Sequence, residues 1–372
     1  MSQRENVNPI REQNHRKNSR RYQKRAAARR RRNTIFIMEI VLLLILAVVL
    51  FFVSKLSKIE KTKLDMDKIE VNEDISQESQ KIMKGYQTIA MFGLDNRSNG
   101  NLSQGRSDVI MLANINNDTK EVKLVSVYRD TYLDTGDGIF QKCNAAYAKG
   151  GPEQAISMLN VNLDLNITDY VTVDFNSIIE CVDLLGGVDM EITDDEASLM
   201  TGYIRELNEL TGNKAENLTQ GGTYTLNGVQ ACAYARIRYG GGDDYRRTER
   251  QRTVLTAMVK KAQQSDLTTV NKLINEVCGD IQTSFSNAEL LALASQVFQY
   301  SIGDTTGFPF TKTTKVLSKK TGDVVIPCDL SDNVKELHIF LYEDSAYTVS
   351  DTVKQNSEKI VSDTGFKSGD GH

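Results

Sequence analysis

Histidine is scarce in this chain, and tryptophan is absent from it. The 372 residues include three histidines, four prolines and no tryptophan. His15 lies in a basic N-terminal segment, His338 in a late helical pattern and His372 at the last position. A Ser-His-Asp hydrolase needs an imidazole beside its nucleophile, so this scatter disfavours that class of enzyme.

Cysteine usage also excludes some classes. The chain has five cysteines, an odd number, and their spacing matches neither a disulfide framework nor a zinc site. Cys181 and Cys232 fall in apolar helical patterns, so we expect them in the core. A bridge between Cys278 and Cys328 is conceivable, although their spacing does not require one.

The formal net charge of −4 hides a strong asymmetry. Residues 1–32 carry twelve Lys and Arg against Glu5 and Glu12, a net +10, which leaves −14 for the rest of the chain. This basic segment has almost no large apolar residues and is expected to be disordered. A nucleic-acid-binding arm is an alternative from composition. Membrane topology already explains the charge, so no nucleic acid is expected as a partner.

Residues 34–53 form a twenty-residue apolar run with one charge, Glu39. A helix of this length spans roughly 30 Å, the thickness of one bilayer core. A cleaved signal peptide is the competing interpretation, but no small-x-small site follows the run, which favours a retained anchor. The positive-inside rule then places the N-terminus in the cytoplasm and the chain after Ser54 outside it.

From residue 87 onward, short apolar runs alternate with helical patterns. This alternation predicts an α/β fold, a sheet covered by helices. Strands are expected at residues 88–92, 109–115, 122–128, 170–175, 188–192 and 324–327, and helices at 153–159, 177–185, 270–277, 288–299 and 333–342. Residues 194–223 are expected to form an amphipathic helix with a glycine-rich return that covers the site.

Charged residues gather where the predicted strands end. Asp95 and Arg97 follow the first strand, Arg106 and Asp108 precede the second, and Arg129 and Asp130 follow the third. Each position alone is ordinary turn chemistry. Ligands of open α/β sheets bind at strand ends, so the repetition indicates a site for a charged ligand.

Arginines recur in residues 234–252. Arg236 and Arg238 lie two apart, so on extended backbone their side chains point the same way. Three glycines follow, which let the chain turn. Asp243 or Asp244 can cap the helix that comes next.

Near the start of that helix, Arg247, Arg250 and Gln251 share one face. Guanidinium groups bind phosphate in a planar fork, and a helix N-terminus favours anions. The combination indicates a site for a multiply charged phosphate. A solvated basic helix is the alternative on this stretch alone.

Six segments in order resemble the LytR–CpsA–Psr family of Gram-positive cell-envelope proteins across residues 85–264. They are Gly93-Leu-Asp-Asn-Arg, Arg106-Ser-Asp, Ser126-Val-Tyr-Arg-Asp, Lys142-Cys-Asn-Ala-Ala-Tyr, Gly186-Gly-Val-Asp and Arg236-Ile-Arg…Asp244-Tyr-Arg-Arg-Thr-Glu-Arg-Gln. The sequence departs from the family at Tyr128, where proline is usual, and at Cys143, where an aliphatic residue is usual. Neither departure removes a charged group.

The resemblance implies a membrane-anchored phosphotransferase. Such enzymes move a glycopolymer, of the wall teichoic acid or capsule type, from a polyprenyl-pyrophosphate carrier to peptidoglycan. By the resemblance, Asp95 and Asp108 hold Mg²⁺ or Mn²⁺. The phosphates are bound by Arg106, Arg129, Arg236, Arg238 and Arg247, and the pocket is completed by Lys142, Asp244 and Gln251. Catalysis is expected from Arg129 and Arg238, with Arg106, Asp108 and Asp244 beside them.

The family fold is an α/β/α sandwich with an apolar tunnel for the lipid. Its candidate lining is the apolar face of helices at residues 156–159 and 178–185, although most of these are expected to be plain core residues. A hydrolase of the same lipid pyrophosphate and a non-catalytic wall-binding or regulatory protein are the alternatives. The expected organisation is a cytoplasmic tail (1–33), a transmembrane helix (34–53), a stalk (54–84), the catalytic domain (85–264), further helices and a strand packed on it (265–361), and a disordered tail (362–372).

Overall fold

The structure, a computed structural model, describes residues 60–61, 64–94, 102, 105–238, 243–266, 269, 272–273 and 281–371. The chain divides into two compact units, Met1–Lys55 and Leu56–His372, and all described residues lie in the second. The predicted membrane span at 34–53 lies outside them. Among the described residues, no helix combines the length and apolar character needed to cross a bilayer.

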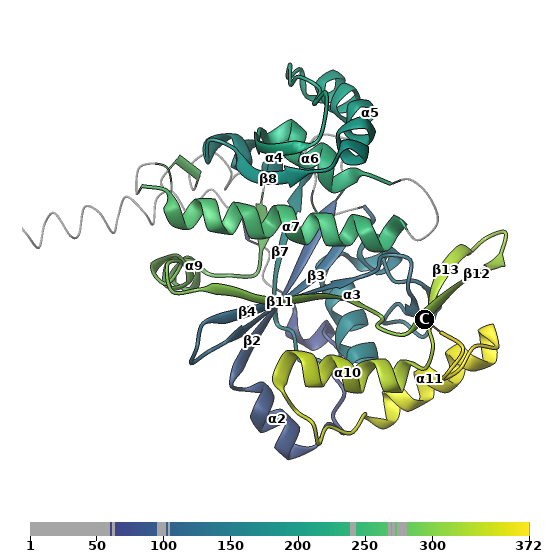
Figure 1. Ribbon diagram of the computed structural model, residues 1–372. Coiled ribbons are helices and arrows are strands. Elements are labelled where there is room, and N and C mark those ends of the chain that lie inside the picture. The colour runs from purple at the N-terminus through teal and green to yellow at the C-terminus, as the bar shows by residue number, and fades with distance from the viewer. Residues whose placement is uncertain are drawn as a thin grey trace, which may run out of the picture. The chain divides into compact units, whose positions relative to one another are not determined.

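A seven-stranded mixed sheet forms the centre of the second unit (Figure 1). Its strands, in spatial order, are β1 (Glu60–Lys61), β10 (Ile281–Thr283), β7 (Asp169–Asp174), β2 (Tyr86–Leu94), β3 (Ser107–Asn116), β4 (Glu121–Val127) and β11 (Ser301–Phe308). β2 is parallel to β7 and antiparallel to β3, and β4 is antiparallel to β3 and parallel to β11. The C-terminal ends of β2, β4, β7 and β11 therefore meet the start of β3 at one edge.

Side-chain alternation along the strands separates two faces. In β2, Ala90, Phe92 and Leu94 belong to one buried cluster, and Ile89 with Met91 belongs to another. The first face packs against four helices: α2 (Gln77–Met83), α3 (Ala145–Leu163), α10 (Leu330–Tyr342) and α11 (Asp351–Thr364). The second face packs against α7 (Asp243–Gln264) and α9 (Asn287–Ser295). The expected helix-covered sheet is confirmed.

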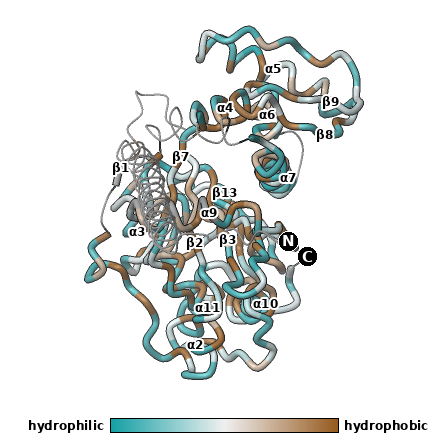
Figure 2. Tube along the Cα trace, turned by 90° about the vertical axis from the view of Figure 1, so that its left-hand side faces the viewer, coloured by the Kyte–Doolittle hydropathy of each residue, from teal (hydrophilic) through white to brown (hydrophobic). Residues whose placement is uncertain are grey.

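A further apolar cluster lies beyond α7. It joins α4 (Phe175–Leu184), α5 (Asp194–Thr211) and α6 (Gly228–Arg236) to a two-stranded ribbon of β8 (Val188–Ile192) and β9 (Gly222–Leu226). Figure 2 views α7 close to end-on, between these elements and the sheet. Gly228 permits close packing of α6 on α4, because a Cβ there would come within 2.1 Å of the Ile179 carbonyl oxygen.

Two short ribbons complete the structure. They are β5 (Tyr132–Asp134) with β6 (Phe140–Lys142), and β12 (Lys312–Ser318) with β13 (Gly322–Pro327). The second ribbon is tied to the end of β4, because the Val325 amide donates to the Asp130 carbonyl at 2.9 Å. It therefore lies beside the strand ends that carry the predicted site.

Both ends of the described chain are more ordered than the sequence predicts. In place of a stalk reaching to residue 84, α2 forms, and Ile69, Ile75 and Met83 are buried in the main core. In place of a disordered tail from residue 362, α11 continues to Thr364, and Phe366 packs against the same core. Single apolar residues, spaced too widely to show a period in a polar segment, anchor these ends.

Most of the other predicted strands and helices are present in the structure. The predicted strands and helices from 88 to 192 match β2, β3, β4, α3, β7, α4 and β8, while the helix at 194 ends at Thr211 and its glycine-rich return becomes β9. Most of the helix expected at 270–277 lies outside the described residues. Cys328 is a free, buried thiol, and Cys278, its conceivable partner, lies outside the described residues.

Candidate active site

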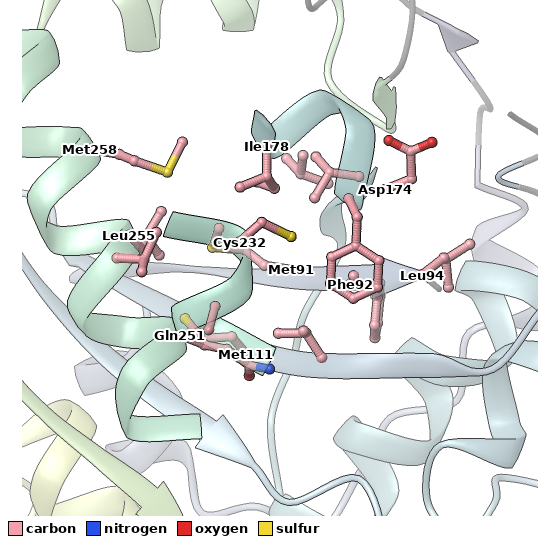
Figure 3. A pocket seen from close by; sticks show the side chains of 17 residues that line it. Met91, Phe92, Leu94, Met111, Asp174, Ile178, Cys232, Gln251, Leu255 and Met258 are labelled. Atoms are coloured by element: carbon pink, nitrogen blue, oxygen red, sulfur yellow. The ribbon is translucent and has the colours of Figure 1, made fainter. Parts of the chain in front are cut away.

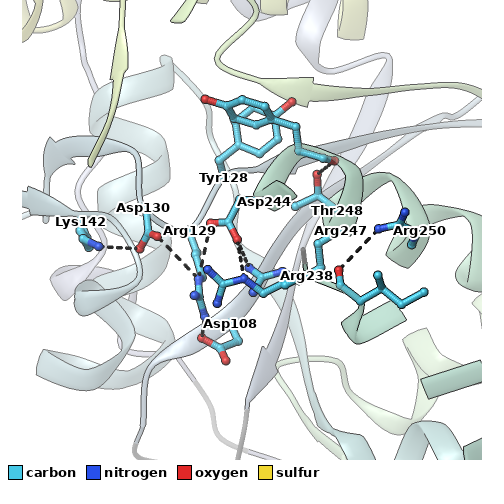
Figure 4. A network of polar contacts seen from close by, with 12 residues as sticks. Asp108, Tyr128, Arg129, Asp130, Lys142, Arg238, Asp244, Arg247, Thr248 and Arg250 are labelled. Atoms are coloured by element: carbon cyan, nitrogen blue, oxygen red, sulfur yellow. Dashed lines mark hydrogen bonds and ion pairs between the residues drawn. The ribbon is translucent and has the colours of Figure 1, made fainter. Parts of the chain in front are cut away.

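The strand-end carboxylates and arginines meet at one edge of the sheet, around Asp244 in the first turn of α7. The Asp244 carboxylate lies 3.2 Å from Arg238 Nε, 3.4 Å from Arg247 Nη2 and 3.8 Å from Arg129 Nε. Arg129 extends from the end of β4, and its Nη1 contacts Asp108 Oδ1 at 2.5 Å (Figure 4). Instead of serving as a helix cap, Asp244 holds three guanidinium groups together.

Lys142 joins the same cluster through Asp130. Its Nζ lies 3.2 Å from Asp130 Oδ1, and Asp130 Oδ2 lies 3.9 Å from Arg129 Nε. Asp130 is the site residue that sequence reasoning did not select, although its place directly after Arg129 at a strand end was the available signal. The cluster holds four cations (Arg129, Lys142, Arg238, Arg247) and three carboxylates (Asp108, Asp130, Asp244).

The positive charge of this cluster is not fully compensated. Arg247 is only 6% exposed, and its Nε and Nη2 lack hydrogen-bond acceptors among the described residues. Burial lowers the pKa of Arg247, and the charge of Arg129 lowers it further, while Asp244 offsets only part of the effect. A buried cation without hydrogen-bonded partners is costly, so the geometry favours an added anion.

The pKa of Arg129 is shifted in the opposite direction from that of Arg247. Burial lowers its pKa, but the negative charges of Asp108, Asp130 and Asp244 together outweigh burial and raise it overall. Its Nε is nevertheless buried without a hydrogen bond, because the two carboxylates facing that atom are 3.8 and 3.9 Å away. The three carboxylates therefore hold this guanidinium in place through charge and the contact to Asp108.

An apolar cavity of about 120 Å³ adjoins the cluster, between the sheet and α4, α6 and α7. Its polar lining side chains are Asp174 and Gln251. Figure 3 shows Gln251, Leu255 and Met258 along the inner side of α7. Gln251 lies one helical turn after Arg247, and its Oε1 is buried without a hydrogen-bond partner. The polar cluster and the apolar cavity therefore share one helix.

The cavity is not where the helix patterns placed the tunnel. Residues 156–159 are buried against the opposite face of the sheet, and only Ile178 of the 178–185 segment lines the cavity. The missed lining comes from β2, β3, β7, α6 and α7. The signal in α7 was the spacing of Gln251, Val254, Leu255 and Met258, which places them on one helical face.

Several predicted site residues do not join the cluster. Arg236 Nη2 pairs with Glu206 at 3.2 Å, and Arg250 Nε pairs with Glu196 at 3.1 Å. Arg236 is the last residue of α6 rather than part of an extended strand, so it does not point the same way as Arg238. Arg106 is exposed at the start of β3, without a described ion-pair partner. The predicted metal ligand Asp95 lies outside the described residues.

The fold and site together define an α/β/α protein in which an arginine–carboxylate cluster adjoins an apolar cavity. A model of the LytR_cpsA_psr family matches residues 46–315, and the chain belongs to this family. It is 30% identical over 210 residues to the polyisoprenyl-teichoic acid–peptidoglycan teichoic acid transferase TagU of Enterococcus faecalis, covering 56% of this chain and 64% of that protein.

Two further comparisons agree. The corresponding transferase TagV of Bacillus subtilis is 30% identical over 195 residues, which cover 51% of this chain and 48% of TagV. The chain thus spans about half to two thirds of the length of these curated relatives. The solved structure of the LytR-CPS2A-psr family protein YwtF (TagT) with bound octaprenyl pyrophosphate superposes with a TM-score of 0.51 and 18% identity, covering 82% of this chain and 99% of that one. The structural superposition shows that the two proteins share a fold.

Proposed function

We propose that this chain is a membrane-anchored phosphotransferase that moves a glycopolymer from a polyprenyl-pyrophosphate carrier to peptidoglycan. One observation carries the proposal: α7 presents Arg247 to the cation cluster and, one turn later, Gln251 to the apolar cavity. A lipid pyrophosphate has the matching form, a multiply charged head on an apolar chain. The names of the TagU and TagV relatives, which state teichoic acid transfer to peptidoglycan, support the same reaction.

In the proposed reaction, an acceptor hydroxyl attacks the sugar-linked phosphorus and loses its proton. A new P–O bond forms to the acceptor, the bond from that phosphorus to the bridging oxygen breaks, and polyprenyl phosphate leaves. Negative charge grows on the bridging oxygen as this bond breaks. Arg129 and Arg238, which face different oxygens of the Asp244 carboxylate, are the residues we assign to stabilise that charge.

A divalent metal fits the donor set only in part within the described residues. Asp108 offers a carboxylate that keeps 25% of its side-chain surface exposed. Mg²⁺ commonly binds one or two carboxylates and completes its shell with substrate phosphates and water. Asp108, with Asp95 outside the described residues, would hold Mg²⁺ or Mn²⁺, which would neutralise pyrophosphate charge. Asp108 also orients Arg129 through their ion pair.

The polymer is proposed to be of the wall teichoic acid or capsule type, and the site is proposed to lie outside the cytoplasm. The test uses the full chain in lipid nanodiscs with a lipid-linked glycopolymer, with and without peptidoglycan. We expect polymer to appear on peptidoglycan in equal amount to the polyprenyl phosphate released. Free polymer released at the same rate without peptidoglycan would instead assign hydrolysis, and no release would leave a binding protein.

A further inference from the structure

A second cationic group lies beside the phosphate cluster and takes no part in it. Arg252 on α7 is 8% exposed, and its Nε and Nη1 are buried without a hydrogen-bond acceptor among the described residues. Arg250, on the same helix and 9% exposed, is satisfied by Glu196 and by the Ile237 carbonyl. The difference between these two buried arginines shows that Arg252 is not simply a structural ion-pair residue.

Lys312 brings a second cation to the same place. Its Nζ lies 4.7 Å from the Tyr245 ring centroid and 5.5 Å from that of Tyr128, and it donates to the Phe310 carbonyl at 3.1 Å. The two rings pack at 4.6 Å, and the Tyr245 hydroxyl is buried without a hydrogen-bond partner. The Lys312 ammonium and the Tyr245 hydroxyl therefore lie at this pair with donor capacity to spare. Burial raises the pKa of Tyr128 and the nearby charge of Arg252 lowers it, so Arg252 lies beside the same pair.

The carboxylates near this group do not neutralise it. Glu249 lies one turn before Arg252, and Asp323 faces Tyr245 from β13, but both side chains are exposed. Neither forms an ion pair with Arg252 or Lys312 in the described part of the chain. Burial lowers the pKa of Arg252 and of Lys312, which is the expected effect of two under-compensated cations.

The chain itself connects this group to the phosphate cluster. Tyr128 directly precedes Arg129, and Tyr245 directly follows Asp244, so each aromatic residue adjoins a member of the cluster. Figure 4 shows Tyr128 on the side of Asp244 away from Asp108. The Tyr128 hydroxyl approaches Gly307 of β11 so closely that a Cβ there would lie 2.1 Å from it. The glycine thus leaves the space that the Tyr128 ring needs.

We propose that Arg252, Lys312 and the Tyr245 hydroxyl form a second anion subsite, which binds one phosphate or carboxylate group of a substrate whose pyrophosphate lies in the first cluster. The inference rests on the proposed function. The first cluster must hold the pyrophosphate of a substrate before the subsite can bind a neighbouring anionic group of that substrate. Burial raises the pKa of Tyr245 to about 12, so its hydroxyl remains a donor at neutral pH. The anionic group comes either from the glycopolymer or from the acceptor.

The test separates these two sources by equilibrium binding and by kinetics, with the full chain and the variants Arg252→Gln and Lys312→Gln. Two lipid-linked oligosaccharides are compared, one with a phosphodiester in its first sugars and one without. Two peptidoglycan fragments are compared as acceptors, one with free carboxylates and one amidated. Arg246→Gln, an exposed arginine on the same helix, is the matched control.

If the donor supplies the anion, both variants should bind the phosphodiester donor about tenfold more weakly and the neutral donor as wild type does. If the acceptor supplies it, the KM for the carboxylated fragment should rise about tenfold while the KM for the amidated fragment stays constant. Polyprenyl pyrophosphate alone should bind equally to wild type and to all three variants, which reports an intact first cluster.

Unchanged binding and unchanged KM in both folded variants would overturn the subsite. Melting curves accompany each variant, and Lys312→Gln, at a half-buried position, decides the question if Arg252→Gln does not fold. The proposed function can fail separately: a wild-type chain that transfers nothing, yet binds the phosphodiester donor in an Arg252-dependent way, would retain the subsite and lose the reaction.

Discussion

At the residue scale, Arg129 joins the strand-end residues of the charged cluster to the residues of the cluster on α7. It reaches Asp108 at the start of β3 with one nitrogen and faces Asp244 of α7 with another. These contacts hold the Arg129 guanidinium at the centre of the cluster before any ligand binds. Preorganised charge of this kind needs little rearrangement when negative charge develops in the transition state.

We expect Arg129→Ala and Arg238→Ala each to lower the transfer rate by about 10²–10³-fold, because each removes a charged donor from the reacting phosphate. The lysine variants should recover only part of the rate, since an ammonium cannot form the bidentate fork. The assay is release of polyprenyl phosphate from a lipid-linked polymer. Arg205→Ala, an exposed residue of α5, is the control. Wild-type turnover by folded Arg129→Ala and Arg238→Ala would refute the phosphate-clamp assignment.

Asp108→Asn should lower turnover and raise the Mg²⁺ concentration needed for half-maximal rate, because it removes both the proposed metal ligand and the ion-pair partner of Arg129. The melting temperature should change little, since the side chain is part-exposed at a strand end. Asp189→Asn, whose carboxylate is 59% exposed and pairs with Lys261, is the control. An unaltered Mg²⁺ titration in Asp108→Asn would rule out the carboxylate role.

At the element scale, α7 combines the two properties that the proposed substrate requires. Asp244 and Arg247 in its first turns belong to the charged cluster, and Gln251, Leu255 and Met258 line the cavity. A cavity of about 120 Å³ is similar in size to engineered cavities that take up benzene. In this conformation it accommodates a short apolar segment of the proposed lipid.

Met258→Trp should fill the cavity and displace at least two methylene groups of a bound lipid. At about 0.8 kcal/mol for each, binding of polyprenyl pyrophosphate should weaken about tenfold. The affinity for inorganic pyrophosphate, measured by competition, should stay constant. Met258 lies three helical turns away from Arg247 of the charged cluster. Thr253→Trp, on the exposed face of α7, is the matched control. Equal lipid affinities in the two variants would place the lipid elsewhere.

Helix α10 carries a buried histidine that should make stability depend on pH. His338 Nε2 lies 3.0 Å from the Leu163 carbonyl, and the ring stacks on Tyr347 at 3.6 Å. Burial lowers the pKa of His338 from 6.5 to about 4. The unfolded chain therefore takes up the proton first as the pH falls. The contribution of neutral His338 to the free energy of unfolding is fully present above pH 6.5 and is lost as the pH falls to about 4.

From pH 7 to pH 5 this histidine alone should remove about 2 kcal/mol from the free energy of unfolding. Denaturant titrations of the wild-type chain and of His338→Gln at both values test the effect. The variant should be less stable at pH 7 but should lose less stability on acidification. Identical losses in both proteins would show that His338 is not the titrating group.

At the scale of the whole molecule, charge is unevenly distributed, in the sense that the proposed membrane topology requires. The basic residues 1–32 carry +10, while the rest of the chain is acidic overall and gathers several of its cations at the site. A reporter fused after Gly371 should be active only outside the cytoplasm, and one inserted after residue 33 only inside it. Cytoplasmic activity of the Gly371 fusion would overturn the proposed topology.

Local sequence determined much of this protein. Short apolar runs bounded by turn residues predicted β2, β3 and β4, and the charged residues at their ends marked Asp108 and Arg129 as candidate site residues. Strand direction then brings such ends to one edge, so an α/β pattern was enough to predict that these residues meet. The start of α7 likewise marked Asp244 and Arg247 as members of the site.

Tertiary structure alone decided which charges pair and which remain available. Arg236 is held by Glu206, thirty residues away in sequence, while Arg252 forms no ion pair with a carboxylate of the described residues. The wall of the cavity also depended on which face of the sheet α7 covers, because residues 156–159 are as apolar as its lining but pack on the other side. Sequence spacing sets the direction of a side chain on its own element, whereas ion pairing and cavity walls depend on distances between elements that only the packed fold brings together.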